Sequence, residues 1–184
     1  MRIEDLIPGF EPENELERRV TRDPELLEGL AWGKPRRAHP EGSIAAHVAD
    51  LLERLDGEGV QGEERALLRF VAIVHDASKN KVQEWRPRVG ANHHAMRARR
   101  FAERYTDDER ILSMIELHDR PYGIWRKMRR TGRLDRRALD SLIRRLVDPD
   151  LFLRFVELDG STEGKSREPV QWFRDELGRR RQAA

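Results

Sequence analysis

The amino-acid sequence predicts an all-α protein, folded as an irregular bundle of helices. Apolar residues recur at intervals of three and four along most of the chain, which places them on one face of a helix. Gly and Pro fall between these segments, and no segment alternates apolar and polar residues as a half-buried strand does. With 184 residues and no internal repeat, the chain suits one domain with a core of its own.

The elements can be placed in order along the chain. Residues 1–38 are an N-terminal extension with short helical stretches, and the turn-rich segment AWGKPRRAHPEG leads out of it. The first long helix is expected over 42–55. The helix over 63–76 is apolar on most sides, so it should be the central, buried one. Later helices are expected from Thr106 (as N-cap) through Ile115 and over 94–105, 135–147, 149–158 and 169–180, with the basic tail GRRRQAA fraying.

Composition excludes several classes of protein and site. The chain has no cysteine, which excludes disulfides, thiolate metal ligands and cysteine nucleophiles. The N-terminus lacks the pattern of a signal peptide, and the longest apolar-rich run, 66–74, is too short to span a bilayer. The 36 Lys and Arg nearly balance the 34 Asp and Glu, which permits nucleic-acid binding without requiring it. We expect a soluble, cytoplasmic protein with no membrane partner; its oligomeric state is not indicated.

Histidines and carboxylates occur on the inward faces of several predicted helices. Each lies three or four residues from apolar residues of its own helix, or closes the most buried helix. These residues are His47, His75, Asp76, His118 and Asp159. One inward histidine is usually a hydrogen-bonded core residue, but several histidines with carboxylates need a common partner.

A shared cation is the partner that these residue types favour. Burying each ionisable group without a partner would cost several kcal/mol. Neutral imidazoles bind a metal ion through nitrogen, and carboxylates supply the opposing charge. Nitrogen and oxygen ligands without sulfur suit Mn, Fe, Co, Ni or Zn better than Ca, with Mg also allowed. The alternative is a buried hydrogen-bond network of His and Asp, in which every member must be satisfied.

The order of these residues resembles the HD-domain metal-dependent phosphohydrolases. That family has a histidine on an early helix, a His-Asp pair ending a buried helix, further histidines after it and a late aspartate. The corresponding segments are HPEGSIAAHV, FVAIVHDASK, ANHHAMRARRF, IELHDRPY and FVELDGSTEGK. The resemblance covers a core of about residues 39–165 and is closest to the HD domain of bacterial tRNA nucleotidyltransferases. It implies a single HD-type domain over 1–184, with a C-terminal helix and basic tail over 166–184.

The resemblance implies a site for divalent metal ions, two rather than one. The implied ligands are His47, His75, Asp76 and Asp159 for one ion, and His93 and His118, with Asp76 shared, for the second. The family pattern assigns the third histidine to His93, whereas helical phase favours His94, which shares a face with the apolar residues of its helix. His93 is the predicted ligand, and His94 remains open.

Catalytic and substrate-binding roles follow from the same resemblance. Asp76 and Lys79 are the predicted catalytic residues, because Lys79 matches the lysine of the HDxGK form of the motif and would contact substrate phosphate. The sequence departs mildly from that form of the motif at Ser78, which stands where the family has glycine. Further candidate substrate contacts are His39, His94, Arg120 and Lys165. His39 either lines the mouth of the site or caps the helix that follows.

The predicted function is a metal-dependent phosphomonoesterase or phosphodiesterase, with a nucleotide or a nucleic-acid-end phosphate as its substrate. A divalent ion lowers the pKa of bound water toward about 7 and neutralises charge on phosphoryl oxygens. The alternative is a non-catalytic, metal-containing module that binds or senses a nucleotide or RNA. The segment GSTEGKS is not a P-loop, because three residues separate Gly160 from Gly164 where the motif has four.

Contact with a nucleic-acid backbone is a further hypothesis. Clustered arginines bind phosphates effectively, although charge runs on helices usually just face solvent. The basic candidates are Arg97, Arg99, Arg100 and the run Arg126–Arg137, and the aromatic candidates for base stacking are Trp85, Tyr122 and Trp125. Of the tryptophans, Trp125 is more easily explained by core packing, whereas Trp85 lies in a predicted loop.

Overall fold

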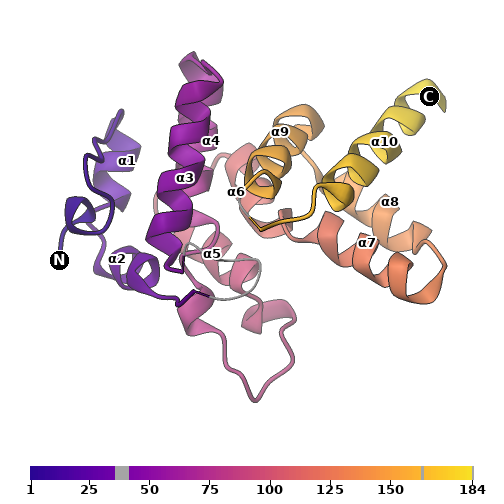
Figure 1. Ribbon diagram of the computed structural model, residues 1–184, viewed down its shortest axis with the longest axis horizontal. Helices are drawn as coiled ribbons and strands as arrows, with labels where there is room; N and C mark the ends of the chain where they lie inside the picture. The colour runs from indigo at the N-terminus through magenta and orange to yellow at the C-terminus, as the bar shows by residue number, and fades with distance from the viewer. Residues whose placement is uncertain (36–41, 163, 184) are drawn as a thin grey trace.

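The computed structural model describes residues 1–35, 42–162 and 164–183, and these residues are helical apart from turns, loops and one isolated bridge (Figure 1). The α-helices are α1 Glu15–Val20, α2 Pro24–Ala31, α3 Ile44–Gly57, α4 Gly62–Val74, α5 His94–Ala102, α6 Glu109–Leu117, α7 Arg120–Thr131, α8 Arg136–Arg145, α9 Pro149–Gly160 and α10 Glu168–Ala183. Three short 3-10 turns are Ile3–Asp5, Lys79–Lys81 and Gly90–Asn92. The prediction of an all-α bundle is confirmed for this part of the chain.

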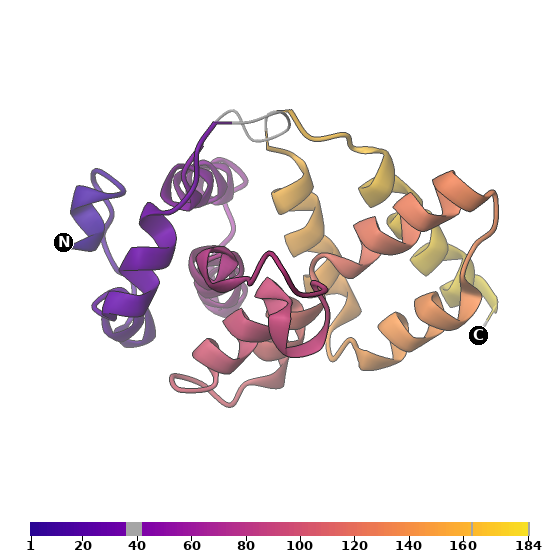
Figure 2. The same ribbon diagram turned by 90° about the horizontal axis from the view of Figure 1, so that it is seen from below.

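Helix α4 lies at the centre of the bundle. It packs against α3, α6 and α9, and every residue from Leu67 to Val74 is buried. Helices α5 and α2 cover the next layer, on α6 and α3, and α7, α8 and α10 pack together on the C-terminal side. The two chain ends lie at opposite ends of the molecule (Figures 1 and 2). A central helix that touches three others is the element best placed to bring distant side chains together.

The first 35 residues belong to the same core. Ile3, Ile7 and Phe10 are buried in the hydrophobic cluster that contains the residues of α3 and α4. Glu17 in α1 is fully buried and accepts two hydrogen bonds, each 3.0 Å long, from the guanidinium of Arg69 in α4. The segment that we predicted as an extension is therefore packed onto the helix that carries the His-Asp pair.

Helix boundaries differ from the prediction at several ends. Helix α6 is capped by Asp108, which accepts a hydrogen bond from the backbone N–H of Arg110, so the predicted N-cap Thr106 is wrong. The hydroxyl of Thr106 instead accepts from the backbone of Asp108. Helix α4 ends at Val74, two residues earlier than predicted. The C-terminal helix runs from Glu168 to Ala183, three residues beyond the predicted end at 180.

Helix α7 was not predicted. Its first turn contains Pro121, which is compatible with a helix start because the missing N–H has no partner there. Its exposed side is arginine-rich, so only Pro121 and Ile124 are buried and the apolar period is weak. Among the described residues, no helix is both long enough and apolar enough to cross a lipid bilayer.

Candidate metal centre

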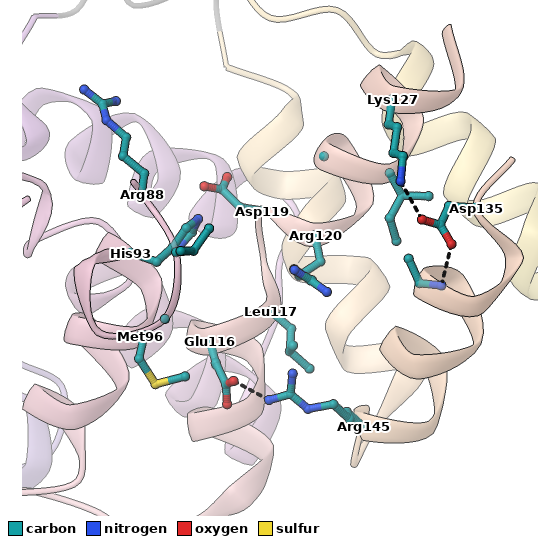
Figure 3. Close-up of a pocket in the computed structure, with 15 residues that line it drawn as sticks. Arg88, His93, Met96, Glu116, Leu117, Asp119, Arg120, Lys127, Asp135 and Arg145 are labelled. Atoms are coloured by element: carbon teal, nitrogen blue, oxygen red, sulfur yellow. Dashed lines mark hydrogen bonds and ion pairs between the residues drawn. The ribbon is translucent and has the colours of Figure 1, made fainter. Parts of the chain in front are cut away.

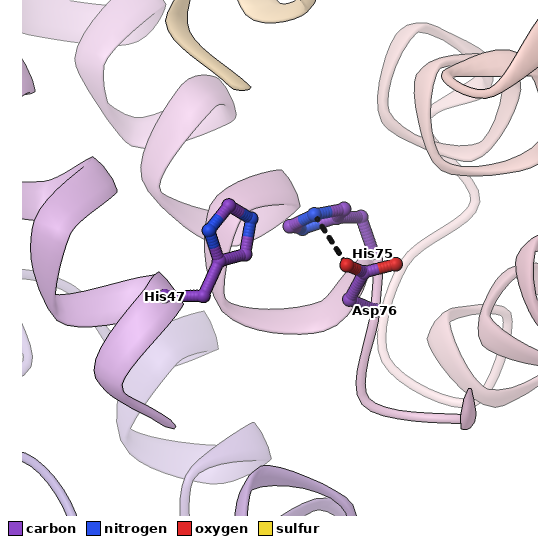
Figure 4. Close-up of side chains that lie close together, drawn as sticks. All are labelled: His47, His75 and Asp76. Atoms are coloured by element: carbon purple, nitrogen blue, oxygen red, sulfur yellow. Dashed lines mark ion pairs between the residues drawn. The ribbon is translucent and has the colours of Figure 1, made fainter. Parts of the chain in front are cut away.

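Four helix ends and one helix interior bring the predicted ligands together. His75 caps the C-terminus of α4 and Asp76 follows it; His118 caps α6 in the same way. His94 is the first residue of α5, His47 lies in α3, and Asp159 lies near the end of α9. Because α4 contacts α3, α6 and α9, side chains far apart in the sequence meet at its C-terminal end (Figure 4).

The first group of ligand atoms surrounds His75. Its Nε2 lies 3.4 Å from Asp76 Oδ2 and 3.8 Å from Asp159 Oδ1. Asp159 Oδ1 is also 2.9 Å from His47 Nε2. Ligand atoms of His47, His75 and Asp76 all lie within 4.8 Å of one another. The structure therefore brings together all four residues that we predicted for one ion.

A second group lies on the other side of Asp76. Asp76 Oδ1 is 3.3 Å from His94 Nε2 and 3.6 Å from His118 Nε2, and these two nitrogens are 3.4 Å apart. Ligand atoms of Asp76, His94 and His118 lie within 4.8 Å of one another. Since Oδ2 faces the first group and Oδ1 the second, the Asp76 carboxylate is placed to bridge two positions.

His94, rather than His93, occupies the position beside Asp76 and His118. The imidazole of His93 instead caps α5, because its Nδ1 accepts a 3.3 Å hydrogen bond from the backbone of Ala95. The two imidazole rings are stacked, with centroids 4.6 Å apart. Helix α5 begins at His94, and the helical phase that buries Ala98 turns His94 inward. In the structure it is therefore His94, the residue that helical phase favoured, that lies beside Asp76 and His118, and which of the two histidines is a ligand stays a prediction.

Asp119 is a member of the site that the sequence did not lead us to assign as a ligand. Its carboxylate lies 3.1 Å from His94 Nε2 and 3.6 Å from His118 Nε2. Ligand atoms of His93, His94 and Asp119 form a third group within 4.8 Å. A signal was present in the sequence, because His118 and Asp119 repeat the His-Asp pair of His75 and Asp76, again at the end of a helix.

Backbone contacts fix the orientation of two imidazoles. His75 Nδ1 lies 3.0 Å from the carbonyl oxygen of Ala72, and His118 Nδ1 lies 2.8 Å from that of Ile115. A carbonyl oxygen only accepts, so each Nδ1 carries the proton and donates it. The lone pair of each Nε2 therefore points away from its own helix, toward the carboxylates. This is the arrangement in which metal-binding histidines are commonly held.

The buried polar atoms of this site match the needs of a cation. His75 Nε2 and Asp76 Oδ1 are buried and make no hydrogen bond with the described residues. Both are acceptors when the imidazole is neutral, and an unsatisfied buried acceptor costs about 1–3 kcal/mol. A positive ion beside His75 Nε2 and Asp76 Oδ2 would satisfy the first of these atoms, and one beside Asp76 Oδ1, His94 and His118 would satisfy the second. The donor set of imidazoles and carboxylates thus fits a divalent metal ion.

The carboxylates are held in their charged form. Burial opposes ionisation of Asp76, but the ammonium of Lys79 and the imidazole of His75 keep its pKa well below the ordinary value. Burial also opposes ionisation of Asp159, and Lys165 and His47 keep its pKa well below the ordinary value. Lys165 Nζ donates to Asp159 Oδ1 at 2.7 Å, and Lys79 Nζ contacts Asp76 Oδ2. Each predicted carboxylate ligand therefore has a lysine beside it.

His94 carries a proton in the absence of an ion. Burial disfavours its charged form, but the carboxylates of Asp119 and Asp76 overcome this and raise the pKa of His94 to about 9. The pKa of Asp119 is lowered in turn: burial opposes this, and the neighbouring His118 and His94 outweigh it. A cation in this position would take over the charge that the proton supplies.

A cavity of about 460 Å³ opens onto these residues. It is lined by Asp76, Lys79, His118, Asp119, Asp159 and Lys165 from the site and by Tyr122 and Trp125 of α7. We call it the metal cavity. A volume of this size accommodates a small organic phosphate or a nucleotide.

A neighbouring cavity of about 520 Å³, the outer cavity, shares Asp119 with the metal cavity (Figure 3). Arg120 and His93 line the outer cavity and are absent from the lining of the metal cavity. The candidate substrate contacts therefore divide, with Lys79 and Lys165 in one cavity and Arg120 in the other. His39 lies outside the described residues.

Comparison of the chain with protein-family models, with curated proteins and with solved structures finds no match.

Proposed function

We propose that this chain is a divalent-metal-dependent phosphoric ester hydrolase of the HD-domain type, acting on a nucleotide or on a nucleic-acid-end phosphate. The observation that carries the proposal is the position of Asp76. Its two carboxylate oxygens face two groups of imidazoles contributed by four different helices and their ends. The resemblance to HD-domain phosphohydrolases predicts a bridging aspartate of this kind.

The residues that would hold the ions follow from the two groups. His47, His75, Asp76 and Asp159 suit one position, and Asp76, His94, His118 and Asp119 suit the other. Nitrogen and oxygen ligands favour Mn, Fe, Co, Ni or Zn over Ca. When bound, such ions supply an activated water and neutralise charge on the phosphoryl oxygens.

The chain's own residues position the substrate. The ammonium groups of Lys79 and Lys165 line the metal cavity, where they can bind phosphoryl oxygens as point charges once an ion shares their carboxylates. The backbone carbonyls of Ala72 and Ile115 keep the two imidazoles that they contact in one orientation. Tyr122 and Trp125, whose rings stack with centroids 6.2 Å apart, provide a wall for a flat organic group.

A second candidate is a non-catalytic metal-containing module that binds or senses a nucleotide or RNA. One observation favours it: Lys79 and Lys165 already neutralise Asp76 and Asp159, so the centre has internal counter-charges without any ion. In that reading the lysines have a structural role and no phosphate is cleaved.

Metal analysis and turnover on one sample separate the two candidates. Protein purified without chelator is analysed for its elements and then tested with p-nitrophenyl phosphate, its bis-ester and a nucleotide panel in Mn, Co or Ni. We expect one to two ions per chain and hydrolysis that Asp76→Asn abolishes. Asp50→Asn, in α3 and paired with Arg54 alone among the described residues, is the matched control and should behave as wild type. Bound metal without turnover would support the binding module; absence of both would refute the metal centre.

A further inference from the structure

An exposed loop with a fixed conformation leads into α5. Asn92 is buried at its end and ties the loop together through its side-chain amide. Its Oδ1 accepts a 2.9 Å hydrogen bond from the backbone N–H of Gln83, and its Nδ2 lies 3.0 Å from Gln83 O and 3.2 Å from Arg86 O. Residues 84–91 are all exposed. The loop therefore holds its shape through one side chain rather than through a core of its own.

This loop displays an aromatic ring that is preceded by one acidic residue, Glu84, and followed by two arginines. Trp85 is 78% exposed, the largest exposed fraction among the large hydrophobic side chains described. Arg86 follows it directly and Arg88 lies three residues on, so the Cα atoms of Trp85 and Arg88 are at most about 11 Å apart. Neither arginine has an ion pair with any described residue. One exposed apolar side chain is ordinary, but an aromatic ring and two unpaired guanidiniums on an ordered loop form a combined binding surface.

The loop continues into the outer cavity beside the metal centre. Arg88 lies at the margin of this cavity and Arg120 lies between the site residues and α8 (Figure 3). Lys127 and Arg145 also line it, but acidic residues neutralise them: Lys127 is 2.8 Å from Asp135, and Arg145 contacts a glutamate. Arg88 and Arg120 thus provide its uncompensated positive charge. Asp119, whose carboxylate is paired with His94, lines both cavities, so the outer cavity adjoins the metal cavity at this residue.

We propose that Trp85, Arg86, Arg88 and Arg120 form a docking track for a single-stranded nucleic acid. An aromatic face binds any unpaired base by stacking, and guanidiniums bind the phosphates between bases. A base in a duplex has no free face for the indole ring, so the track selects single strands. Taken with the proposed function, on which this step rests, the substrate becomes a phosphorylated strand end rather than a free nucleotide.

Binding is measured first, in chelator, so that it does not depend on turnover. The probe is a fluorescently labelled single-stranded decanucleotide, and its anisotropy is followed with the full chain at several salt concentrations. Trp85→Ala should weaken binding between about 5-fold and 150-fold and leave the salt dependence unchanged. Arg88→Ala should reduce the slope of log K against log salt by about 0.7, the value of one phosphate contact on a single strand.

Two exposed residues that are not part of the track are matched controls. Trp32, 41% exposed, lies after α2, and Arg22 is an exposed arginine without an ion pair among the described residues. Trp32→Ala and Arg22→Ala should bind the decanucleotide as wild type does. If Trp85→Ala also binds as wild type does, the proposal is overturned, as it would be if an acidic peptide competed equally well with the decanucleotide.

Turnover then tests the link to the metal centre. With metal, Trp85→Ala should raise KM for a phosphorylated decanucleotide by the same factor and leave hydrolysis of a nucleoside monophosphate unchanged. An equal loss on both substrates would contradict docking at Trp85. If wild type binds the strand through Trp85 but hydrolyses nothing, the proposed function fails while the docking track stands.

Discussion

Asp76 turns one carboxylate oxygen toward His75 and the other toward His94 and His118. A carboxylate has enough lone pairs to serve two cations, whereas an imidazole with its Nδ1 bound to a carbonyl has only one free lone pair. Asp76 therefore suits the shared position, because its carboxylate faces both groups of imidazoles. The sequence predicts the positions of some of the surrounding site residues better than those of others.

His94→Ala and His93→Ala test which histidine is the ligand. We expect His94→Ala to lose one of two bound ions or to weaken its binding by at least ~10-fold, since even outer contacts of metal ligands are worth that much. His93→Ala removes only the cap at Ala95 and should keep wild-type stoichiometry. Titration calorimetry with Mn or Zn measures both. If His93→Ala lost an ion and His94→Ala kept both, His93 would be the ligand.

The protonation of His94 gives a pH prediction for the chelated protein. The ordinary value is 6.5, and burial opposes the charge, but Asp119 and Asp76 raise the pKa of His94 to about 9. A raised pKa stabilises the folded state fully below pH 6.5, by on the order of 3 kcal/mol, and this contribution is lost as pH rises through about 9. An imidazole NMR titration should place the His94 midpoint near 9, with affinity for metal rising over the same range. A midpoint near 6.5 would contradict the prediction.

Helical phase explains what could be predicted at single residues. His47, His118 and Asp159 lie on the apolar faces of their helices, so the same periodicity that predicts burial predicts convergence. The predicted helix over 94–105 begins at the same residue as α5, and its phase already favoured His94; the preference for His93 came from the family pattern. Asp119 was missed because it lies outside the apolar period, directly after α6.

At the level of elements, the C-terminal ends of helices position the histidine and aspartate side chains of the site. Helices α4 and α6 each end in a histidine C-cap followed by an aspartate, and both histidines donate to a carbonyl of the last turn. The chain turns immediately after α4, which directs the Asp76 side chain away from the helix axis. Helix α2 supports this turn from outside, because Gly29 lies against the backbone of Ala77.

Gly29→Ala should damage the site without touching a ligand. A Cβ at this position would lie 1.8 Å from the carbonyl oxygen of Ala77, a backbone atom that cannot move aside alone. We expect a loss of about 1–3 kcal/mol in the free energy of unfolding and weaker metal binding through displacement of Asp76. Urea denaturation and metal titration measure the two effects.

Gly57→Ala is the matched control, a glycine at the end of α3 with open space around its Cβ position. It should leave metal binding unchanged and not lower stability. If Gly29→Ala matched this control, the contact between α2 and the turn would not support the site.

Most elements were predictable, and the exceptions have local causes. Strong apolar periods in α3, α4 and α9 predicted those helices within a few residues. Helix α7 has few buried residues, so its pattern resembles that of a charged loop. The cavities could not be predicted, because their walls come from α6, α7, α9 and the segment before α10, whose packing angles leave no trace in periodicity.

At the scale of the molecule, the N-terminal segment and the bundle are one packing unit. Arg69, in α4, is buried and reaches Glu17 of α1 through two hydrogen bonds. Its other contacts are with Glu13, 3.1 Å away, and the carbonyl oxygen of Glu11. The central helix is thus held by α1 at its middle, while its C-terminal end carries the cluster of His and Asp side chains.

Glu17→Gln tests this anchor. Removing one charge leaves the Arg69 guanidinium only partly compensated in the interior, and breaking such a pair costs about 3 kcal/mol or more. Denaturant unfolding followed by circular dichroism should show one cooperative transition at a lower midpoint. Glu15→Gln, an exposed acid in the same helix, should change stability by less than about 1 kcal/mol. Two separate transitions in wild type would mean that the segment folds independently.

The lysine ammoniums beside Asp76 and Asp159 have a consequence for the order of assembly. In a zinc finger the ligands repel one another until metal arrives, so the polypeptide acquires its shape only on loading. Here each carboxylate already has a lysine beside it, so we expect the chain to fold without metal and the proposed ions to bind to the folded protein. Dialysis against chelator should therefore leave the helical circular-dichroism spectrum intact. The dialysed protein should then bind whichever transition metal is added.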